Sequence, residues 1–199
     1  GSVKAVMEQK DKEKGIIGVV ADIIKVDAKY ETAIETALGG NIQNIVTEDE
    51  ETAKRMIGYL KKARAGRATF LPLTSITHPQ EFKNPDALKE KGVLGMADAL
   101  VKVDKKYQNV AKAMLGRIVV VDHVDNAVKI ARKFDYGIRM VTLEGELLVP
   151  GGAISGGAFK NNSNLLGRRR EMEELEKKVK QYLLDIDNIL NDIEETKKG

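Results

Sequence analysis

The chain has 199 residues, 42% of them hydrophobic and 32% charged, and its 33 basic and 30 acidic side chains leave a net charge of +3. This length supports one large domain or two small ones with a substantial core. Cysteine is absent and histidine occurs twice, which excludes disulfide scaffolds, thiol catalysis and cysteine-based zinc sites. The longest stretch without a charged side chain, residues 147–159, has 13 residues, whereas a membrane-spanning helix needs about 20. We therefore expect a cytoplasmic protein without a membrane segment.

Residues 1–14 form a short charged segment that favours a helix. Its apolar side chains are Val3, Ala5, Val6 and Met7. We interpret this segment as the stub of a coiled-coil helix that pairs antiparallel with a helix at the other end of the chain.

An internal repeat organises the middle of the chain. Residues 18–39 and 95–116 align without gaps and are identical at eight of 22 positions. In each copy a shared aspartate is the predicted N-cap of an amphipathic helix, and the closing glycine is the predicted left-handed residue after it. These residues are Asp27 and Gly39 in the first copy and Asp104 and Gly116 in the second.

Each copy is followed by a predicted strand, a helix and another strand. The first of these helices is predicted to open with a capping box of Thr47 and Glu50. The sequence therefore predicts an α+β fold of two pseudo-repeated α/β subdomains, residues 15–83 and 84–166. The strands are predicted at residues 42–46 and 68–73 in the first copy, and at 118–121 and 139–143 in the second.

Five of the 18 glycines gather near the end of the second subdomain. Glu144 and Gly145 are predicted to form a tight hairpin turn. The glycine spacing matches neither a P-loop nor a dinucleotide fingerprint, and no acidic, histidine or serine cluster at catalytic spacing accompanies it. A phosphate cradle, close approach of another chain and a flexible loop remain as interpretations. The five are Gly145, Gly151, Gly152, Gly156 and Gly157.

Residues 167–199 carry an apolar stripe with alternating spacings of three and four. Such a stripe is typical of a coiled-coil seam and requires a partner helix, although a single helix packed on its own domain is the alternative. Residues 167–198, 32 in number, span about 48 Å as a helix, against roughly 18 Å for residues 3–14. We therefore expect a piece of a longer protein whose coiled coil continues beyond both ends. The stripe consists of Met172, Leu175, Val179, Tyr182, Ile186, Ile189 and Ile193.

Helices at both ends, a duplicated middle and paired glycines together resemble the hinge domain of a bacterial SMC (structural maintenance of chromosomes) protein. The most specific parts are Arg-Ala-Thr-Phe-Leu-Pro-Leu at residues 67–73 and the run from residue 142 to the second glycine pair at 156–157. The resemblance implies the hinge fold, with two antiparallel coiled-coil arms leading to a distant ATPase head. It also implies a ring-like homodimer with two contact surfaces. The ATPase motifs of the family are absent from this chain, so we expect no enzymatic activity, cofactor or metal.

The resemblance also implies which residues form the dimer contact. Paired glycines lie at that contact in the family, and a neighbouring strand is expected to pair across the interface. In this sequence the glycines are Gly145, Gly151, Gly152, Gly156 and Gly157, and the strand residues are Met140, Val141, Thr142 and Leu143.

SMC hinges are similar to one another in carrying basic surfaces that contact DNA, and two basic clusters are candidates here. Contacts of this kind are made to phosphates and are independent of base sequence. The alternative for the first cluster is a helix end whose cations complement the helix dipole, with Gly66 as its C-cap. The first cluster is Lys61, Lys62, Arg64 and Arg67, and the second is Arg168, Arg169 and Arg170.

The resemblance thus implies a dimerisation module that joins two SMC arms, contacts DNA and serves chromosome condensation and segregation at the nucleoid. The alternative is a nucleotide- or phosphate-binding enzyme domain that uses the glycine-rich loop.

Overall fold

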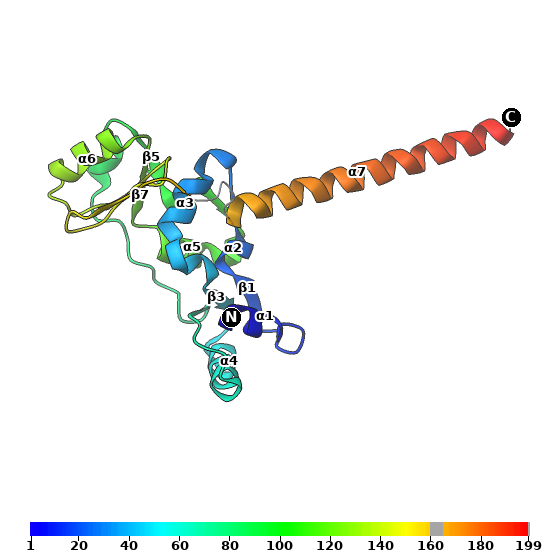
Figure 1. Cartoon of the computed structure of the whole chain (residues 1–199), viewed down its shortest axis with the longest axis horizontal. Helices are drawn as coiled ribbons and strands as arrows, with labels where there is room; N and C mark the ends of the chain where they lie inside the picture. The colour runs from blue at the N-terminus through cyan, green and yellow to red at the C-terminus, as the bar shows by residue number, and fades with distance from the viewer. Residues whose placement is uncertain (160–164, 199) are drawn as a thin grey trace.

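The computed structural model describes residues 1–159 and 165–198 of the chain. Residues 160–164, at the end of the predicted second subdomain, lie outside the described residues. Figure 1 shows a mixed helix and strand body from which one long helix projects. Helices α4 and α6 lie at opposite ends of this body, and α3 and α5 lie between them.

The first unit of the body alternates short strands with helices. Two of its connections are 3-10 helices, η1 and η2. In chain order it contains β1 (Ile16–Val19), α2 (Val20–Ile23), β2 (Ile24–Val26), η1 (Ala28–Tyr30), α3 (Glu31–Leu38), η2 (Gly39–Gln43), β3 (Ile45–Thr47), α4 (Glu50–Ala63) and β4 (Phe70–Pro72).

The second unit repeats this order after a connecting segment and then adds a hairpin. A 3-10 helix, η4, stands where the first unit has α2, and the strands β9 and β10 have no counterpart in the first unit. The elements are η3 (Pro85–Lys89), β5 (Val93–Met96), η4 (Ala97–Leu100), β6 (Val101–Val103), η5 (Lys105–Tyr107), α5 (Gln108–Leu115), β7 (Ile118–Val121), α6 (Val124–Lys133), β8 (Arg139–Thr142), β9 (Leu147–Leu148) and β10 (Ile154–Ser155).

Both units build their sheet in the same way. The first strand pairs antiparallel with the third, β1 with β3 and β5 with β7, and each pair has a register shift beside a glycine. A helix then crosses to a parallel strand, which gives the pairs β3–β4 and β7–β8. The first sheet has the order β1-β3-β4 and the second β10-β9-β8-β7-β5.

A two-stranded ribbon joins the two units. In it β2 pairs antiparallel with β6, and Lys25 lies directly opposite Lys102. Because β2 and β6 are equivalent strands of the repeat, this pairing places a local pseudo-two-fold axis between the two lysines. The two copies of the sequence repeat therefore contact each other through β2 and β6.

Alternate side chains of strand β7 pack into two different hydrophobic cores. Successive side chains of a strand point to opposite faces. Ile118 and Val120 pack in the large core that both units share. Val119 and Val121 pack on the other face, in a smaller core that includes Ile130 of α6.

Several predicted helix ends differ from the structure. Helices α3 and α5 begin after Tyr30 and Tyr107, and the predicted N-caps Asp27 and Asp104 precede the 3-10 helices η1 and η5 instead. Helix α4 is capped by Asp49, whose Oδ1 accepts a 2.8 Å hydrogen bond from the backbone N–H of Thr52, and not by Thr47. The Thr47 hydroxyl instead donates to the backbone carbonyl of Asp49. Gly39 has the predicted positive φ, but Gly116 has a φ of −72°.

The N-terminal segment differs from the predicted coiled-coil stub. Helix α1 (Ser2–Met7) is only six residues long and packs against α4. Its Val6 is fully buried in the large core. Figure 1 accordingly shows the N-terminus beside α4 and away from the long helix. In this structure the apolar residues of the segment pack on the body, and pairing of residues 1–14 with a helix of the coiled coil stays a prediction.

The long C-terminal helix is confirmed as α7 (Leu165–Lys198). Its 34 residues correspond to about 51 Å. The predicted seam is exposed along its whole length, from Met172 at 61% to Ile193 at 47%. None of the helices in residues 1–159 and 165–198 is long and apolar enough to cross a membrane.

Candidate dimerisation surface and nucleic-acid interface

Strand β10 forms an open edge of the five-stranded sheet. Among residues 1–159 and 165–198 it pairs on one side only, with β9, through Ile154 opposite Leu148 and Ser155 opposite Leu147. All residues from 151 to 159 are exposed, and two of them are large and apolar: Ile154 at 55% and Phe159 at 59%. An exposed strand edge with apolar side chains is a template for pairing with another chain.

Strand β4 forms an open edge of the other sheet. The backbone N–H of Leu73 donates to Thr47, and the carbonyl of Thr69 accepts from Ile45, so odd-numbered residues face β3. The N–H and the carbonyl of Phe70 therefore point to the free side, whereas the carbonyl of Pro72 accepts hydrogen bonds from the backbone N–H groups of Ser75 and Ile76. Pro72 lacks an N–H but removes no hydrogen bond of the ladder at that position, as expected for a proline in an edge strand. Each unit thus offers an open edge of this kind, β4 in the first and β10 in the second, while β1 and β5 are the other outer strands of the two sheets.

The expectation that residues 140–143 pair across an interface does not hold. Strand β8 lies between β7 and β9, so both of its edges are already paired. Met140, Val141 and Thr142 are completely buried, and the N–H of Leu143 donates to Val121. The two-residue strand β9 pairs with the edge of β8 at which a second chain was expected.

Gly145 makes the predicted hairpin turn but is covered by its own chain. Its φ is +92°, and its N–H donates to Thr142. A Cβ at this position would lie 2.7 Å from the ring of Phe159 and 3.1 Å from the methyl group of Thr32. Gly145 therefore permits close packing within the monomer, and its predicted place at a contact with a second chain is not available.

The remaining glycines present bare backbone beside β10. Gly151, Gly152 and Gly157 have positive φ angles of 101°, 104° and 140°, which side chains other than glycine adopt at a cost. A Cβ on Gly151 or Gly157 would meet nothing within 4 Å. On Gly156 it would lie 3.0 Å from Glu146. These glycines surround the free edge and leave space for another backbone to approach.

An apolar pocket of about 160 Å³ adjoins the same edge. It lies between α6 and the β9–β10 hairpin, and its lining includes Val128, Tyr136, Leu148 and Ile154. Tyr136 is 45% exposed. The pocket extends the apolar surface of β10 towards α6.

The glycine stretch does not form a phosphate cradle in the described residues. Gly151 and Gly152 lie in the turn between β9 and β10, not in a loop that opens a helix. Within residues 1–159 and 165–198 no group of three or more acidic, histidine or cysteine side chains could hold a metal ion. His123 caps α6, with its Nδ1 3.2 Å from the backbone nitrogen of Asp125.

The first basic cluster gathers at the C-terminal end of α4. Lys61, Lys62, Arg64 and Arg67 are all exposed. None of them forms an ion pair with a described residue. Arg64, at φ +50°, is the left-handed residue that ends the helix, so Gly66 is not the C-cap. The cations also complement the negative end of the helix dipole.

Two of the three arginines in the second basic cluster attach α7 to the body through ion pairs. Arg169 pairs with Asp22 of α2, and Arg170 pairs with the buried Glu31 of α3. Hydrogen bonds to Glu31 and Glu174 raise the pKa of Arg170 above its ordinary value. Two of the three predicted DNA contacts therefore bind carboxylates of the same chain, and only Arg168 is exposed.

The sequence did not indicate the two strand edges as candidate contact surfaces. Phe70 and Pro72 lie in the run of residues 67–73 that carries the family resemblance, but no contact role was predicted for them or for Ile154. The sequence pattern that could have indicated the exposed edge at β10 is Ile154, a large apolar residue between the pairs Gly151-Gly152 and Gly156-Gly157.

Comparison with known families agrees with this geometry. The family described as "SMC proteins Flexible Hinge Domain" matches residues 13–131. The chain therefore belongs to the SMC hinge family, whose domain is a dimerisation module and not a catalytic domain.

The relatives include chromosome partition proteins and solved hinge domains. The chain is 43% identical over 179 residues to the chromosome partition protein Smc of Halothermothrix orenii, and 41% identical over 181 residues to that of Bacillus subtilis. Each alignment covers 89% of this chain but only 15% of the relative.

The structural relatives show the same fold. The hinge domain of Geobacillus stearothermophilus SMC, described as an asymmetric dimer, is 38% identical with a TM-score of 0.82, over 90% of this chain and 73% of that one. The Pyrococcus furiosus Smc hinge with an extended coiled coil is 34% identical with a TM-score of 0.65, over 96% and 70%.

Proposed function

We propose that two copies of this chain join through strand β4 of one copy and strand β10 of the other, twice, about a two-fold axis. The observation that carries this proposal is the exposure of all nine residues from 151 to 159 beside an unpaired strand edge. Each contact extends the β1-β3-β4 sheet of one copy into the β10-β9-β8-β7-β5 sheet of the other. Because each copy offers both edges, two contacts close the assembly and leave neither edge free.

The affinity of this contact comes mainly from apolar burial. Strands β4 and β10 have three and two residues, so few hydrogen bonds form, and each contributes only about 1 kcal/mol net. Complete burial of a large aliphatic or aromatic side chain contributes roughly 1.5–3 kcal/mol. Ile154 and Phe159 are therefore the principal anchors, and the glycines remove the side chains that would hold the backbones apart.

A glycine variant tests this arrangement. In Gly157→Val the added Cβ lies within 4 Å of no described residue, and the φ of +140° means that the substitution also strains the backbone. We expect a folded protein with weakened self-association. Gly39→Val is the matched control, because Gly39 is also exposed, has a positive φ of +53° and has nothing within 4 Å of its Cβ direction. A Gly157→Val protein that remains dimeric at the concentrations where Gly39→Val does would contradict the proposed contact.

We further propose that the cluster at the end of α4 contacts DNA, assisted by Arg168. Four exposed cations without ion pairs to described residues support this assignment. Each phosphate contact contributes about 0.9 to the slope of log K against log salt. Replacing Lys61, Lys62 and Arg64 by glutamine is therefore expected to lower the slope by about 2.7. A slope equal to that of the unmodified chain would place the DNA contact elsewhere.

In the whole protein the chain is proposed to hold two coiled-coil arms together. The curated relatives are chromosome partition proteins of which this chain covers 15%, and the exposed seam of α7 provides the start of one arm. Chromosome organisation, and an ATPase outside this chain, belong to that proposed context.

A further inference from the structure

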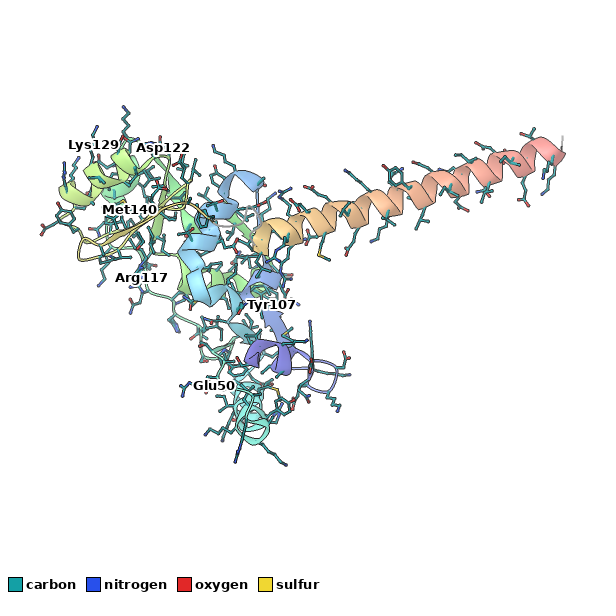
Figure 2. All side chains as sticks on the ribbon, in the orientation of Figure 1. Glu50, Tyr107, Arg117, Asp122, Lys129 and Met140 are labelled. Carbon is teal, nitrogen blue, oxygen red and sulfur yellow. The ribbon has the colours of Figure 1, made fainter. Side chains whose placement is uncertain are left out.

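A cleft of about 300 Å³ lies where the second unit meets the segment that connects the two units. Its walls come from the end of α5, from the first residues of β7 and β8, and from residues 82–84. Figure 2 shows Arg117, which lines this cleft, on the side of the body away from the projecting helix. The apolar part of the lining consists of Phe82, Ala113, Met114, Ile118, Ile138 and Pro150.

Three cations and an amide also line the cleft, and none of its described lining residues is acidic. Lys83 and Arg139 are exposed, and their side chains form no ion pair or hydrogen bond with a described residue. Arg117 donates from Nη1 to Oε1 of Gln80 at 2.6 Å, which leaves its other N–H groups without an acceptor among the described residues. Asn84 is the N-cap of η3, yet its side chain makes no capping hydrogen bond. The cleft therefore presents several unused donors.

The two arginines stand at the ends of neighbouring strands. Ile118, directly after Arg117, lies opposite Arg139 in the parallel pair β7–β8, and neighbouring strands are about 4.8 Å apart. Like charges brought this close raise the energy of the folded chain unless an anion lies between them. Lys83 adds a third charge of the same sign. The fold thus gathers positive charge here without a lining carboxylate to neutralise it.

We propose that this cleft, the Arg117–Arg139 cleft, binds a small organic phosphate, a compact dianion attached to an apolar group. Arginine binds phosphate oxygens through two parallel N–H groups, and Lys83 and Asn84 supply further donors. The apolar side chains beside the cations match the non-polar part of such a ligand, as is typical of small-molecule sites of about 300 Å³ and more. The cleft shares no residue with strands β4 and β10 or with the two basic clusters. The inference is therefore independent of the proposed dimer and DNA contacts.

NMR of the methionine methyl groups locates the ligand. The chain has six methionines, of which Met114 lines the cleft. The probe is phenyl phosphate, and a titration to about 10 mM covers affinities down to the millimolar range. We expect the Met114 resonance to shift and saturate, while those of Met7, Met56 and Met172 stay in place. Inorganic phosphate, which lacks the apolar ring, should bind more weakly at the same ionic strength.

Variants of equal charge separate a defined site from general attraction of anions. Arg117→Gln/Arg139→Gln removes two of the three cations, and the affinity should fall at least about tenfold because hydrogen bonds to charged groups are strong. The control, Lys91→Gln/Lys129→Gln, removes the same charge from two exposed lysines without ion pairs to described residues and should retain the affinity. Figure 2 shows Lys129 on α6, apart from Arg117.

Each outcome supports or overturns the assignment. A Met114 shift that is lost only in Arg117→Gln/Arg139→Gln, with the melting temperature retained, supports it. If this variant does not fold, Arg139→Gln alone, which leaves the bond between Arg117 and Gln80 in place, gives the same comparison. An unmoved Met114 resonance, or equal affinities in both double variants, overturns the proposal. Displacement of phenyl phosphate by a short duplex at the same phosphate concentration would also overturn it, because the cleft would then be a nucleic-acid contact.

Discussion

Leu166 is expected to fix the direction in which the coiled-coil arm leaves the body. It lies in the first turn of α7, is 4% exposed and belongs to the large core. Leu166→Ala removes three carbon atoms from this contact. At about 0.8 kcal/mol for each buried methylene, the loss of transfer free energy is about 2.4 kcal/mol. A residual cavity adds to this value, and Leu→Ala changes in cores cost roughly 2–5 kcal/mol. We expect a loss of about 2.5–3 kcal/mol, because the site lies at the surface of the body and can partly collapse.

Urea unfolding measures this loss directly. With a slope near 2 kcal/mol/M, typical of a small domain, the midpoint should fall by about 1.3 M. Leu175→Ala is the matched control, since Leu175 lies on the same helix but is 60% exposed, and its midpoint should hardly change. A spin label on α7 should also become more mobile relative to the body in Leu166→Ala alone. Equal midpoints for the two variants would refute the conclusion that Leu166 anchors the arm.

Three further predictions concern single contacts. Hydrogen bonds from Thr52 lower the pKa of Asp49. The stability that this cap provides is therefore present above the ordinary aspartate pKa and is lost as pH falls through the lowered value. The melting temperature of Asp49→Ala should accordingly fall less steeply in acid than that of the unmodified chain. Gly145→Ala should destabilise the monomer by at least about 1 kcal/mol, since its φ is +92° and Phe159 blocks the Cβ, and unchanged calorimetric stability would contradict this. Arg170→Gln should lower the melting temperature while Arg168→Gln should not, and equal melting temperatures would remove the distinction drawn between them.

The duplication was the part of the fold most accessible from the sequence. Eight identities in 22 positions located equivalent strands and helices, and β7 (Ile118–Val121) matches its predicted bounds. Hydrophobic periodicity also identified α7 as a long helix with a coiled-coil seam. These features are local, so short windows of sequence contain the information.

The features that could not be predicted depend on distant partners. The carboxylates that bind Arg169 and Arg170 lie 147 and 139 residues earlier in the chain, and no local pattern announces them. Strand β9 has only two residues, too few for a period of two, so β8 was predicted to have a free edge that the structure fills. Helix α1 is short and apolar on one side, and its packing against α4 depends on tertiary contacts that the local sequence does not specify.

Sedimentation equilibrium over a wide concentration range tests the central claim most directly. The unmodified 21.9 kDa chain is predicted to sediment at twice that mass. Ile154→Asp, which places a charge on the exposed β10 edge, should sediment as a folded monomer, whereas Leu88→Asp, at 38% exposure on η3, should remain dimeric. A monomer at every concentration for the unmodified chain, or a dimer in Ile154→Asp as stable as in Leu88→Asp, would contradict dimerisation through the β10 edge.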